Sequence, residues 1–273
     1  MDDISDIREM YDAAWDRENI RLERHQLERD ITWRYLDAYL PPPGARVLEV
    51  GSATGHYTFE LARRGYVLTA VDLSPNMVAR ARARASELAM GDHIEFVVGD
   101  LRELTGIPTN AYDAALIMGP LYHLVLHEDR LMALRRVFEV LRPGGMMISS
   151  WLSRFGIMGD LMKNMPDWVF KREEVSSILE RGRDLDWYRS HGSDEFRGYF
   201  CILSEVAQTH EEVGFNTLTV AGAEPAISAD DESYNRLEGE IRRLWLDLLF
   251  SISTEPTMAA SSRHLLYIGR KPL

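Results

Sequence analysis

Hydrophobic and polar positions divide this chain into segments of two kinds. Short, nearly continuous apolar runs occur at residues 46–50 (RVLEV), 67–71 (VLTAV), 94–98 (IEFVV), 112–118 (YDAALIM) and 146–151 (MMISSW). Runs of this length and character predict buried β-strands. Between them lie longer stretches whose apolar residues recur at helical spacing, for example Leu131, Leu134, Phe138 and Leu141. The first five predicted strands therefore alternate with helices.

The same alternation returns near the end of the chain. A helix is predicted at about 203–213, and strands are predicted at 214–222 (GFNTLTVAG) and 262–271 (SRHLLYIGRK), with an amphipathic helix at 234–252 between them. Strand–helix alternation with apolar strands is typical of a parallel sheet covered on both faces. We therefore expect an α/β fold, namely a doubly wound, mostly parallel, seven-stranded Rossmann-like sheet with helices on both faces.

Two segments depart from this rhythm. Residues 4–40 are charged but carry apolar residues at helical spacing, and PPPG at 41–44 ends that helical region. Residues 152–200 are irregular and rich in aromatic residues, in WVFKREE, LDWYRSHG and FRGYF. These aromatic residues fit a substrate cap or a small satellite core. We predict an N-terminal helical lid at 1–43, a cofactor-binding half of the core at 44–151, an inserted cap at 152–200 and completion of the sheet by 201–273.

Composition narrows the class of protein. The formal net charge of -12 disfavours an extended nucleic-acid surface, which needs many Lys and Arg side chains. Cys201 is the only cysteine, which excludes a multi-cysteine metal site, and we predict no metal site. The charged N-terminus and the lack of a long apolar run predict a cytoplasmic protein with no membrane partner. The sequence leaves the oligomeric state open.

A glycine-containing loop follows the first predicted strand, in VLEVGSATGHY. Gly51 and Gly55 allow a sharp turn and a close approach of the backbone to a ligand. A helix N-terminus directly after a parallel strand lies where open α/β sheets bind ligands. The dinucleotide fingerprint G-x-G-x-x-G is incomplete, because Ala53 and His56 stand where it has glycines. The loop therefore predicts a ligand but disfavours a pyrophosphate.

Three carboxylates lie at or near the ends of the predicted strands. Asp72 ends the second strand, 21 residues after Gly51, where an acidic residue can accept hydrogen bonds from both hydroxyls of a ribose. Asp100 follows the third strand, where its carboxylate could accept from an adenine amino group. Glu49 lies in the first strand. This pattern favours an adenosine-containing ligand.

These pieces as a set resemble the class I S-adenosylmethionine-dependent methyltransferases. The matching segments are VLEVGSATG, VDLSPNMVARAR, FVVGDL, YDAALIMGPLYHL and VLRPGG, which cover about residues 44–151. GPLYHL and ERHQLERDITWRYLDAYLP are similar to a small-molecule subgroup of methyltransferase type 11-like proteins. Ala53 departs from the family, which usually has glycine there.

The resemblance implies S-adenosyl-L-methionine as cofactor, S-adenosyl-L-homocysteine as product and a small molecule as methyl acceptor. It implies that Glu49 holds the ammonium of the methionine moiety and that Asp72 binds the ribose hydroxyls. The remaining implied cofactor residues are Gly51, Ala53 and Gly55 on the loop, Leu73, Met77, Asp100 and Leu101 around adenine, and Met118 and Gly119 near the methyl group. Besides these, Tyr57 could line the pocket, and Arg24 could pair with the methionine carboxylate.

Catalysis of methyl transfer needs few residues, because a sulfonium methyl is already activated. His123 could act as a general base, with Tyr122 beside it, but a buried histidine could equally be a hydrogen-bonded core residue. Tyr11, Trp15 and His25 are lid candidates. The predicted function is methyl transfer to an N, O or C nucleophile by in-line displacement. The alternatives are a non-catalytic adenosine-ligand-binding protein and a nucleotide-dependent oxidoreductase.

Overall fold

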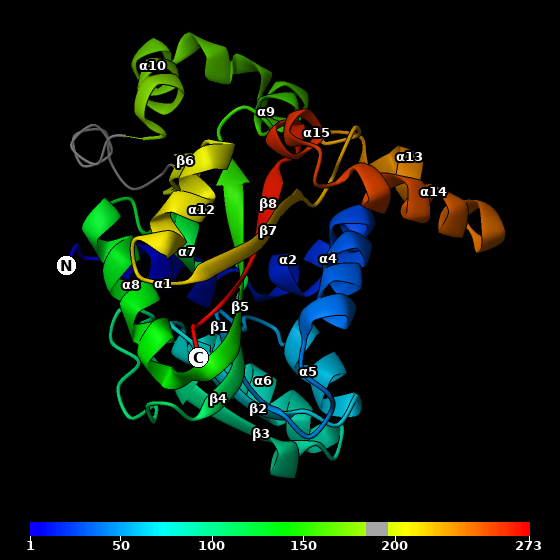
Figure 1. The fold of residues 1–273 in the computed structure, drawn as a ribbon. Helices are drawn as coiled ribbons and strands as arrows, with labels where there is room; N and C mark the ends of the chain where they lie inside the picture. Colours follow the sequence, from blue (N-terminus) through cyan, green and yellow to red (C-terminus); the bar gives the residue numbers. More distant parts are fainter. Residues whose placement is uncertain (184–195) are drawn as a thin grey trace.

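A computed structural model describes residues 1–183 and 196–273 (Figure 1). Its strands form one sheet and comprise β1 (Arg46–Val50), β2 (Val67–Asp72), β3 (Ile94–Val98), β4 (Tyr112–Ile117), β5 (Leu141–Ser153), β6 (Phe200–Cys201), β7 (Asn216–Gly222) and β8 (His264–Arg270). The strand order is β3-β2-β1-β4-β5-β8-β7, and β6 pairs with β5 outside this path. The sheet thus places β1 beside both β2 and β4.

The helices of the described residues connect these strands or precede them. They are α1 (Ser5–Asp12), α2 (Trp15–Asn19), α3 (Arg21–Arg24), α4 (Gln26–Tyr39), α5 (His56–Arg63), α6 (Pro75–Glu87), η1 (Gly91–His93), α7 (Pro120–His123), α8 (His127–Val140), α9 (Met158–Asn164), η2 (Pro166–Phe170), α10 (Arg172–Arg181), α12 (Leu203–Glu211), α13 (Asp231–Asn235), α14 (Gly239–Ile252) and α15 (Pro256–Ser261). Helices α5, α6 and α8 each lie between two strands that run parallel in the sheet.

The predicted doubly wound α/β fold is confirmed. Strands β1 to β5 pair in parallel, whereas β8 runs antiparallel to both β5 and β7. The sheet has eight strands rather than the seven expected. The additional strand β6 contains only two residues, which is too short to produce a periodic pattern in the sequence. Strand β5 is also longer than expected, because its pairing begins at Leu141 before a bulge at the RPGG segment.

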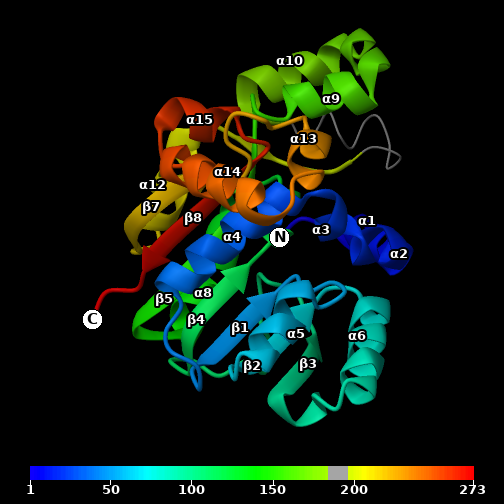
Figure 2. The same ribbon diagram turned by 90° about the vertical axis from the view of Figure 1, so that its right-hand side faces the viewer.

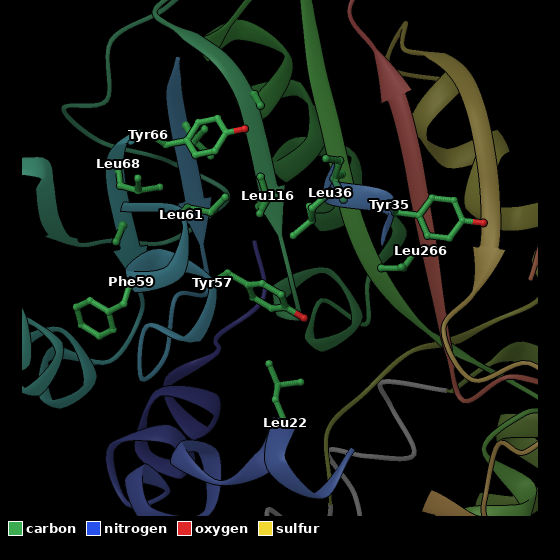
Figure 3. Close-up of a cluster of buried hydrophobic side chains, with 14 of the residues drawn as sticks. Leu22, Tyr35, Leu36, Tyr57, Phe59, Leu61, Tyr66, Leu68, Leu116 and Leu266 are labelled. Carbon is green, nitrogen blue, oxygen red and sulfur yellow. The ribbon is translucent and has the colours of Figure 1, made fainter. Parts of the chain in front are cut away.

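Two apolar clusters cover the two faces of the sheet. Along β8, Leu266 and Ile268 belong to one cluster, whereas Leu265 and Tyr267 belong to the other. This alternation follows from the two-residue period of a strand. Helices α4 and α5 lie on one side of the sheet and α8 and α12 on the other (Figure 1). Figure 3 shows the first cluster, where side chains of α4 and α5 meet those of the strands.

The N-terminal segment is more broken than the sequence suggested. Residues 4–40 form four helices, α1 to α4, rather than one long helix. The breaks turn the first three helices away from α4, so that both Ile7 and Leu22 are buried. The predicted helix at 234–252 is likewise split into α13 and α14, with Gly239 in a left-handed conformation at φ +56°. Figure 2 shows α4 and α14 side by side on the same face of the sheet.

The segment after β5 forms α9, η2 and α10, which stand beyond the end of the sheet (Figures 1 and 2). Trp168 and Ile178 pack there with Leu152 and Phe200 in a small cluster of their own. The aromatic stretch at 185–192 lies outside the described residues. None of the helices in the described part of the chain is long and apolar enough to cross a membrane.

Candidate functional site

The loop after β1 is shaped by its glycines. Gly51 has φ +79°, and a Cβ there would lie 2.4 Å from the Pro120 side chain, so only glycine fits. The N–H groups of Gly51 and Ser52 both donate to the carbonyl of Val71, at 2.8 and 3.2 Å. Ala53 also has a positive φ of +44°, which is a strained conformation for alanine. The loop is therefore held tightly between β2 and the segment after β4.

Asp72 joins this loop to the next helix. Its carboxylate accepts hydrogen bonds from the backbone N–H of Ala53 at 2.8 Å and of Ser74 at 2.9 Å. Burial raises the pKa of Asp72 to about 6, although both hydrogen bonds act to lower it. The negative charges of Asp12 and Glu18 raise it further. The Asp72 carboxylate thus lies in an acidic, desolvated place that favours a ligand with hydrogen-bond donors or positive charge.

Glu49 is buried in β1, with only 1% of its surface exposed. The hydroxyl of Thr58 donates a hydrogen bond to its carboxyl group. Burial raises the pKa of Glu49 to about 8; the Thr58 bond opposes this rise, and the charge of Asp72 adds to it. Glu49 therefore holds a proton at neutral pH, and a cation placed beside it would favour loss of that proton.

The proton on Glu49 makes the free energy of unfolding depend on pH. The folded protein keeps the Glu49 proton up to about pH 8, whereas the unfolded chain loses it near pH 4.5. Since the folded state binds more protons between these values, this group makes the free energy of unfolding fall as pH rises. At 1.36 kcal/mol per pKa unit, the free energy of unfolding falls by roughly 4–5 kcal/mol at most. We expect Glu49→Gln to flatten urea-unfolding stability between pH 5 and 9 and to exceed the wild type above pH 8.

The matched control is Glu60→Gln, because Glu60 lies on α5 with an exposed side chain that pairs with Arg64. That variant should keep the wild-type pH slope. If Glu49→Gln and the wild type lose stability equally as the pH rises, Glu49 does not carry the proton.

Asp100 is engaged by a neighbouring arginine. Both Asp100 oxygens accept hydrogen bonds from Arg102, whose Nη2 lies 2.6 Å from Oδ2. The same guanidinium donates to Asp129 at 2.9 Å and to the Asp2 carbonyl at 2.7 Å. The Asp100 carboxylate therefore lies in the cavity wall but is already paired. The backbone of Leu101, rather than this carboxylate, is the less occupied hydrogen-bonding group at the end of β3.

His123 is buried at the end of α7, with both ring nitrogens bonded. Its Nδ1 lies 2.8 Å from the Arg197 carbonyl, which can only accept, so Nδ1 carries the proton. Its Nε2 therefore accepts from the Tyr11 hydroxyl, also at 2.8 Å. Burial lowers the pKa of His123 to about 4. The imidazole is neutral, and it can accept a proton from a ligand only if Tyr11 releases Nε2.

This geometry predicts the effect of removing the Tyr11 hydroxyl. A hydrogen bond to the neutral imidazole disfavours its protonated form, so Tyr11→Phe should raise the pKa of His123. Loss of the donor should also destabilise the fold by about 1–2 kcal/mol. The measurement is an NMR titration of the imidazole nitrogens. Tyr66→Phe is the control, because its hydroxyl bonds the Pro41 carbonyl at 2.8 Å, away from the cavity. An unchanged His123 pKa in Tyr11→Phe would count against this hydrogen-bond assignment.

These groups surround one cavity at the carboxyl ends of β1, β2, β3 and β4. It holds about 1000 Å³ of space not filled by protein atoms, part of it open to solvent. Strands β2 and β4 flank β1 on opposite sides, which is the switch point where doubly wound sheets bind ligands. The predicted residues that line it are Glu49, Gly51, Ala53, Tyr57, Asp72, Leu73, Asp100, Leu101, Met118, Gly119, Tyr122 and His123.

Three predicted site residues lie outside the cavity wall. Gly55 begins α5 with φ +82°, close against Phe59. Met77 is buried within α6, where its N–H donates to the Ser74 hydroxyl. Arg24 is exposed at the end of α3, and only its carbonyl bonds another segment, at Asn235. The expected placement of Arg24 is wrong, because the short helix α3 turns that side chain away from the cavity.

The sequence did not reveal several other lining residues. Arg21 lines the cavity instead of Arg24, together with Glu18 and Leu22 from the same segment. Ser52 and Thr54 also line it, and their buried hydroxyl oxygens have no hydrogen-bond partner within the described residues. Arg21 and Arg24 are three residues apart and would share one face of a helix, so a prediction for Arg24 could have included Arg21. Nothing in the local sequence distinguishes the two.

Comparison with known proteins shows what this chain is similar to. Residues 47–145 match the family model described as "Methyltransferase domain". The core of this chain is therefore similar to a methyltransferase domain. The matched range covers the glycine loop, Asp72, Asp100 and the segment around His123. The predicted resemblance to class I S-adenosylmethionine-dependent methyltransferases is thereby confirmed.

Curated relatives match this chain over a somewhat longer range. A ubiquinone biosynthesis O-methyltransferase of Xanthomonas axonopodis pv. citri (strain 306) is 32% identical over 140 residues, which are 51% of this chain and 56% of that protein. One of Xanthomonas oryzae pv. oryzae (strain PXO99A) is 31% identical over 168 residues, which are 62% and 65%. The chain thus spans little more than half of the first of these relatives.

Solved structures share the fold over more of the chain. An S-adenosylmethionine-dependent methyltransferase from Mesorhizobium loti has a TM-score of 0.58 at 22% identity, covering 88% of this chain and 97% of that one. The 1,6-didemethyltoxoflavin-N1-methyltransferase of Burkholderia thailandensis has a TM-score of 0.60 at 18% identity, covering 98% and 88%. At these identities the likeness concerns the fold.

Proposed function

We propose that this protein transfers a methyl group from S-adenosylmethionine to a small-molecule acceptor by in-line displacement. The observation that carries the proposal is the position of the Asp72 carboxylate, which lies beside the Gly51 loop in a cavity whose other end is aromatic. An adenosine ligand places donor hydroxyls where such a carboxylate can accept them. The aromatic end would receive the acceptor.

The residues present fit this cofactor. The buried hydroxyls of Ser52 and Thr54 lack partners among the described residues, and a polar ligand in the cavity would satisfy them. Leu73, Leu101 and Met118 supply an apolar wall against which the base and the methionine chain of the cofactor could pack. Glu49, protonated while buried, would ionise beside an ammonium group. We assign Asp72 to the ribose, the Leu101 backbone to adenine and the Gly51 loop to the methionine moiety.

When bound, S-adenosylmethionine supplies an activated methyl group on its sulfonium sulfur. The chain's part is to align an acceptor atom, exclude water and take up a proton where one is released. Ile4, Ile7 and Leu22 of the N-terminal segment cover the cavity and would exclude water. Tyr122 and the Tyr11–His123 pair face the same space, so we place the acceptor there. In this proposal the N-terminal segment acts as a lid, residues 44–151 bind the cofactor, and the segment after β5 forms a cap.

The relatives suggest two classes of acceptor. One relative is named for ubiquinone biosynthesis and O-methylation, and one solved structure is named as an N1-methyltransferase. A cavity rich in tyrosine suits a flat aromatic acceptor of either kind. The net charge of -12 supports a small molecule rather than a nucleic acid, and we propose a cytoplasmic location.

Titration calorimetry with S-adenosylhomocysteine and with NADH tests the cofactor assignment. We expect the first to bind and the second not to, since Ala53 and His56 interrupt the dinucleotide fingerprint. Transfer of labelled methyl from S-adenosylmethionine to catechol, phenol and azaheterocycle probes then tests turnover. Tighter binding of NADH would favour the oxidoreductase alternative. Binding without turnover on any probe would favour the non-catalytic alternative.

A further inference from the structure

A buried group of ionisable side chains lies directly behind the cavity. The carboxyl groups of Glu28 and Glu224 and the imidazole of His264 bring ligand atoms within 4.8 Å of one another. Such a set could hold a cation. In this structure the Arg21 guanidinium is the cation among them, because its Nη2 lies 2.8 and 2.9 Å from the Glu28 oxygens and 3.2 Å from His264 Nε2. The group therefore holds an arginine.

The hydrogen bonds fix the state of His264. Its Nδ1 lies 2.7 Å from Glu224 Oε1, and its backbone N–H donates to Glu224 Oε2 at 3.0 Å. Glu224 is 1% exposed, and an ionised carboxylate can only accept, so Nδ1 carries the proton. Arginine can only donate, so Nε2 presents its lone pair to Arg21. One carboxylate thus orients both the backbone and the ring of His264 toward Arg21.

The charges in this group shift the pKa of Glu28. Burial alone would raise the pKa of Glu28, but the positive charge of Arg21 and its hydrogen bonds hold that pKa below its usual value. Glu28 is therefore ionised at neutral pH and stays paired with Arg21. The pair joins α3, which carries Arg21, to α4, which carries Glu28, while His264 adds a contact from β8.

Arg21 uses only one of its three nitrogens for these contacts. No hydrogen bond within residues 1–183 and 196–273 involves its Nε or Nη1, although the side chain lines the cavity and is 27% exposed. These two nitrogens lie on either side of Cδ and share no edge that could hold one carboxylate by two parallel hydrogen bonds, but each can still donate a charge-assisted hydrogen bond. Arg21 therefore keeps donors that an anionic group of a ligand in the cavity could use.

We propose that Arg21 binds a carboxylate of the ligand in the cavity and that His264, oriented by Glu224, is the residue that positions it. This inference rests on the proposed function. The carboxylate belongs either to the methionine moiety of the cofactor or to an acidic acceptor. His264 and Glu224 are positioning residues, because they touch Arg21 rather than the ligand.

The experiment compares two ligands that differ only in the carboxylate, each measured with the wild type and with the variants. Calorimetry measures binding of S-adenosylhomocysteine and of S-adenosyl-3-thiopropylamine, which lacks the carboxylate, to the wild type, Arg21→Ala and His264→Ala. We expect each variant to bind S-adenosylhomocysteine at least about 10-fold more weakly, in line with loss of a charged hydrogen bond, and the amine within about two-fold of wild type. His264→Gln, whose amide oxygen can accept, should recover part of the loss.

A second arm tests the other source of the carboxylate. Benzoate is titrated into each protein saturated with S-adenosylhomocysteine. Weaker benzoate binding by Arg21→Ala and His264→Ala, with unchanged cofactor binding, assigns the carboxylate to an acceptor and supports the proposal. Arg24→Ala is the matched control, because that exposed arginine lies three residues away and should change neither arm.

Two results would overturn this inference without contradicting the proposed function. One is equal weakening of both adenosyl ligands, which indicates a structural role; the other is no effect of Arg21→Ala in either arm. Thermal melts of each variant show whether it is folded at the temperature of the titration. Failure of the wild-type protein to bind S-adenosylhomocysteine contradicts the proposed function itself, which keeps the two failures apart.

Discussion

Asp72→Ala is expected to lower the affinity for S-adenosylhomocysteine by more than about 100-fold. A hydrogen bond to a charged group contributes roughly 1.5–3 kcal/mol, and 1.4 kcal/mol corresponds to a tenfold change. The carboxylate that would receive two ribose hydroxyls is also the one that holds the N–H of Ala53 and of Ser74. Its removal therefore takes away ligand contacts and loosens the loop at the same time. Titration calorimetry measures the change.

The control for this variant is Asp37→Ala, because Asp37 is exposed and pairs only at the surface with Arg64. It should bind the ligand as the wild type does. Asp72→Asn should fall between wild type and Asp72→Ala, since the amide keeps one acceptor oxygen but loses the charge. Wild-type affinity in a folded Asp72→Ala protein would remove Asp72 from the ligand site.

Gly51→Ala is expected to abolish ligand binding and to destabilise the fold more than Gly44→Ala does. The new Cβ would lie 2.4 Å from Pro120 Cγ and 2.5 Å from its Cδ, while φ of +79° adds strain of about 1–2 kcal/mol. A clash with a rigid proline ring cannot be relieved by rotating a side chain. The loop and the start of α7 must move apart, which opens the cavity wall.

Gly44→Ala separates the two causes. Gly44 also has a left-handed backbone, with φ +94°, but a Cβ there meets nothing within 4 Å. It should cost only the conformational strain, and it lies before β1, outside the cavity wall. Thermal unfolding and calorimetry of both variants decide the matter. If Gly51→Ala matches Gly44→Ala in melting temperature and binding, the contact with Pro120 is unimportant.

The order of elements could be predicted because it depends on local patterns. Apolar runs such as 67–71 need burial on both faces wherever they lie, and Ser74-Pro75 starts a helix by its own chemistry. Strand β6 escaped prediction because two residues carry no period. The breaks between α1, α2 and α3 were not predicted, because the helical spacing of apolar residues does not mark where one short helix ends and the next begins.

The site divides in the same way. Gly51 and Asp72 could be found from the sequence, since a ligand at the end of parallel strands constrains nearby backbone and spacing. Arg21 could not be distinguished from Arg24, because which side chain faces inward depends on the path of a four-residue helix. The bond between Tyr11 and His123 joins residues 112 positions apart, and no local pattern records such a pairing.

By itself, the sequence determined the class of fold, the glycine loop, the acidic residues at the strand ends and the resemblance to methyltransferases. These features arise from short-range rules of burial period, backbone freedom and spacing along one strand and its loop. Only the tertiary structure decided that His123 is neutral and already bonded, that Asp100 is paired with Arg102 and that Arg21 faces the cavity. Protonation and pairing depend on neighbours brought together from distant segments, so they exist only once the chain has folded.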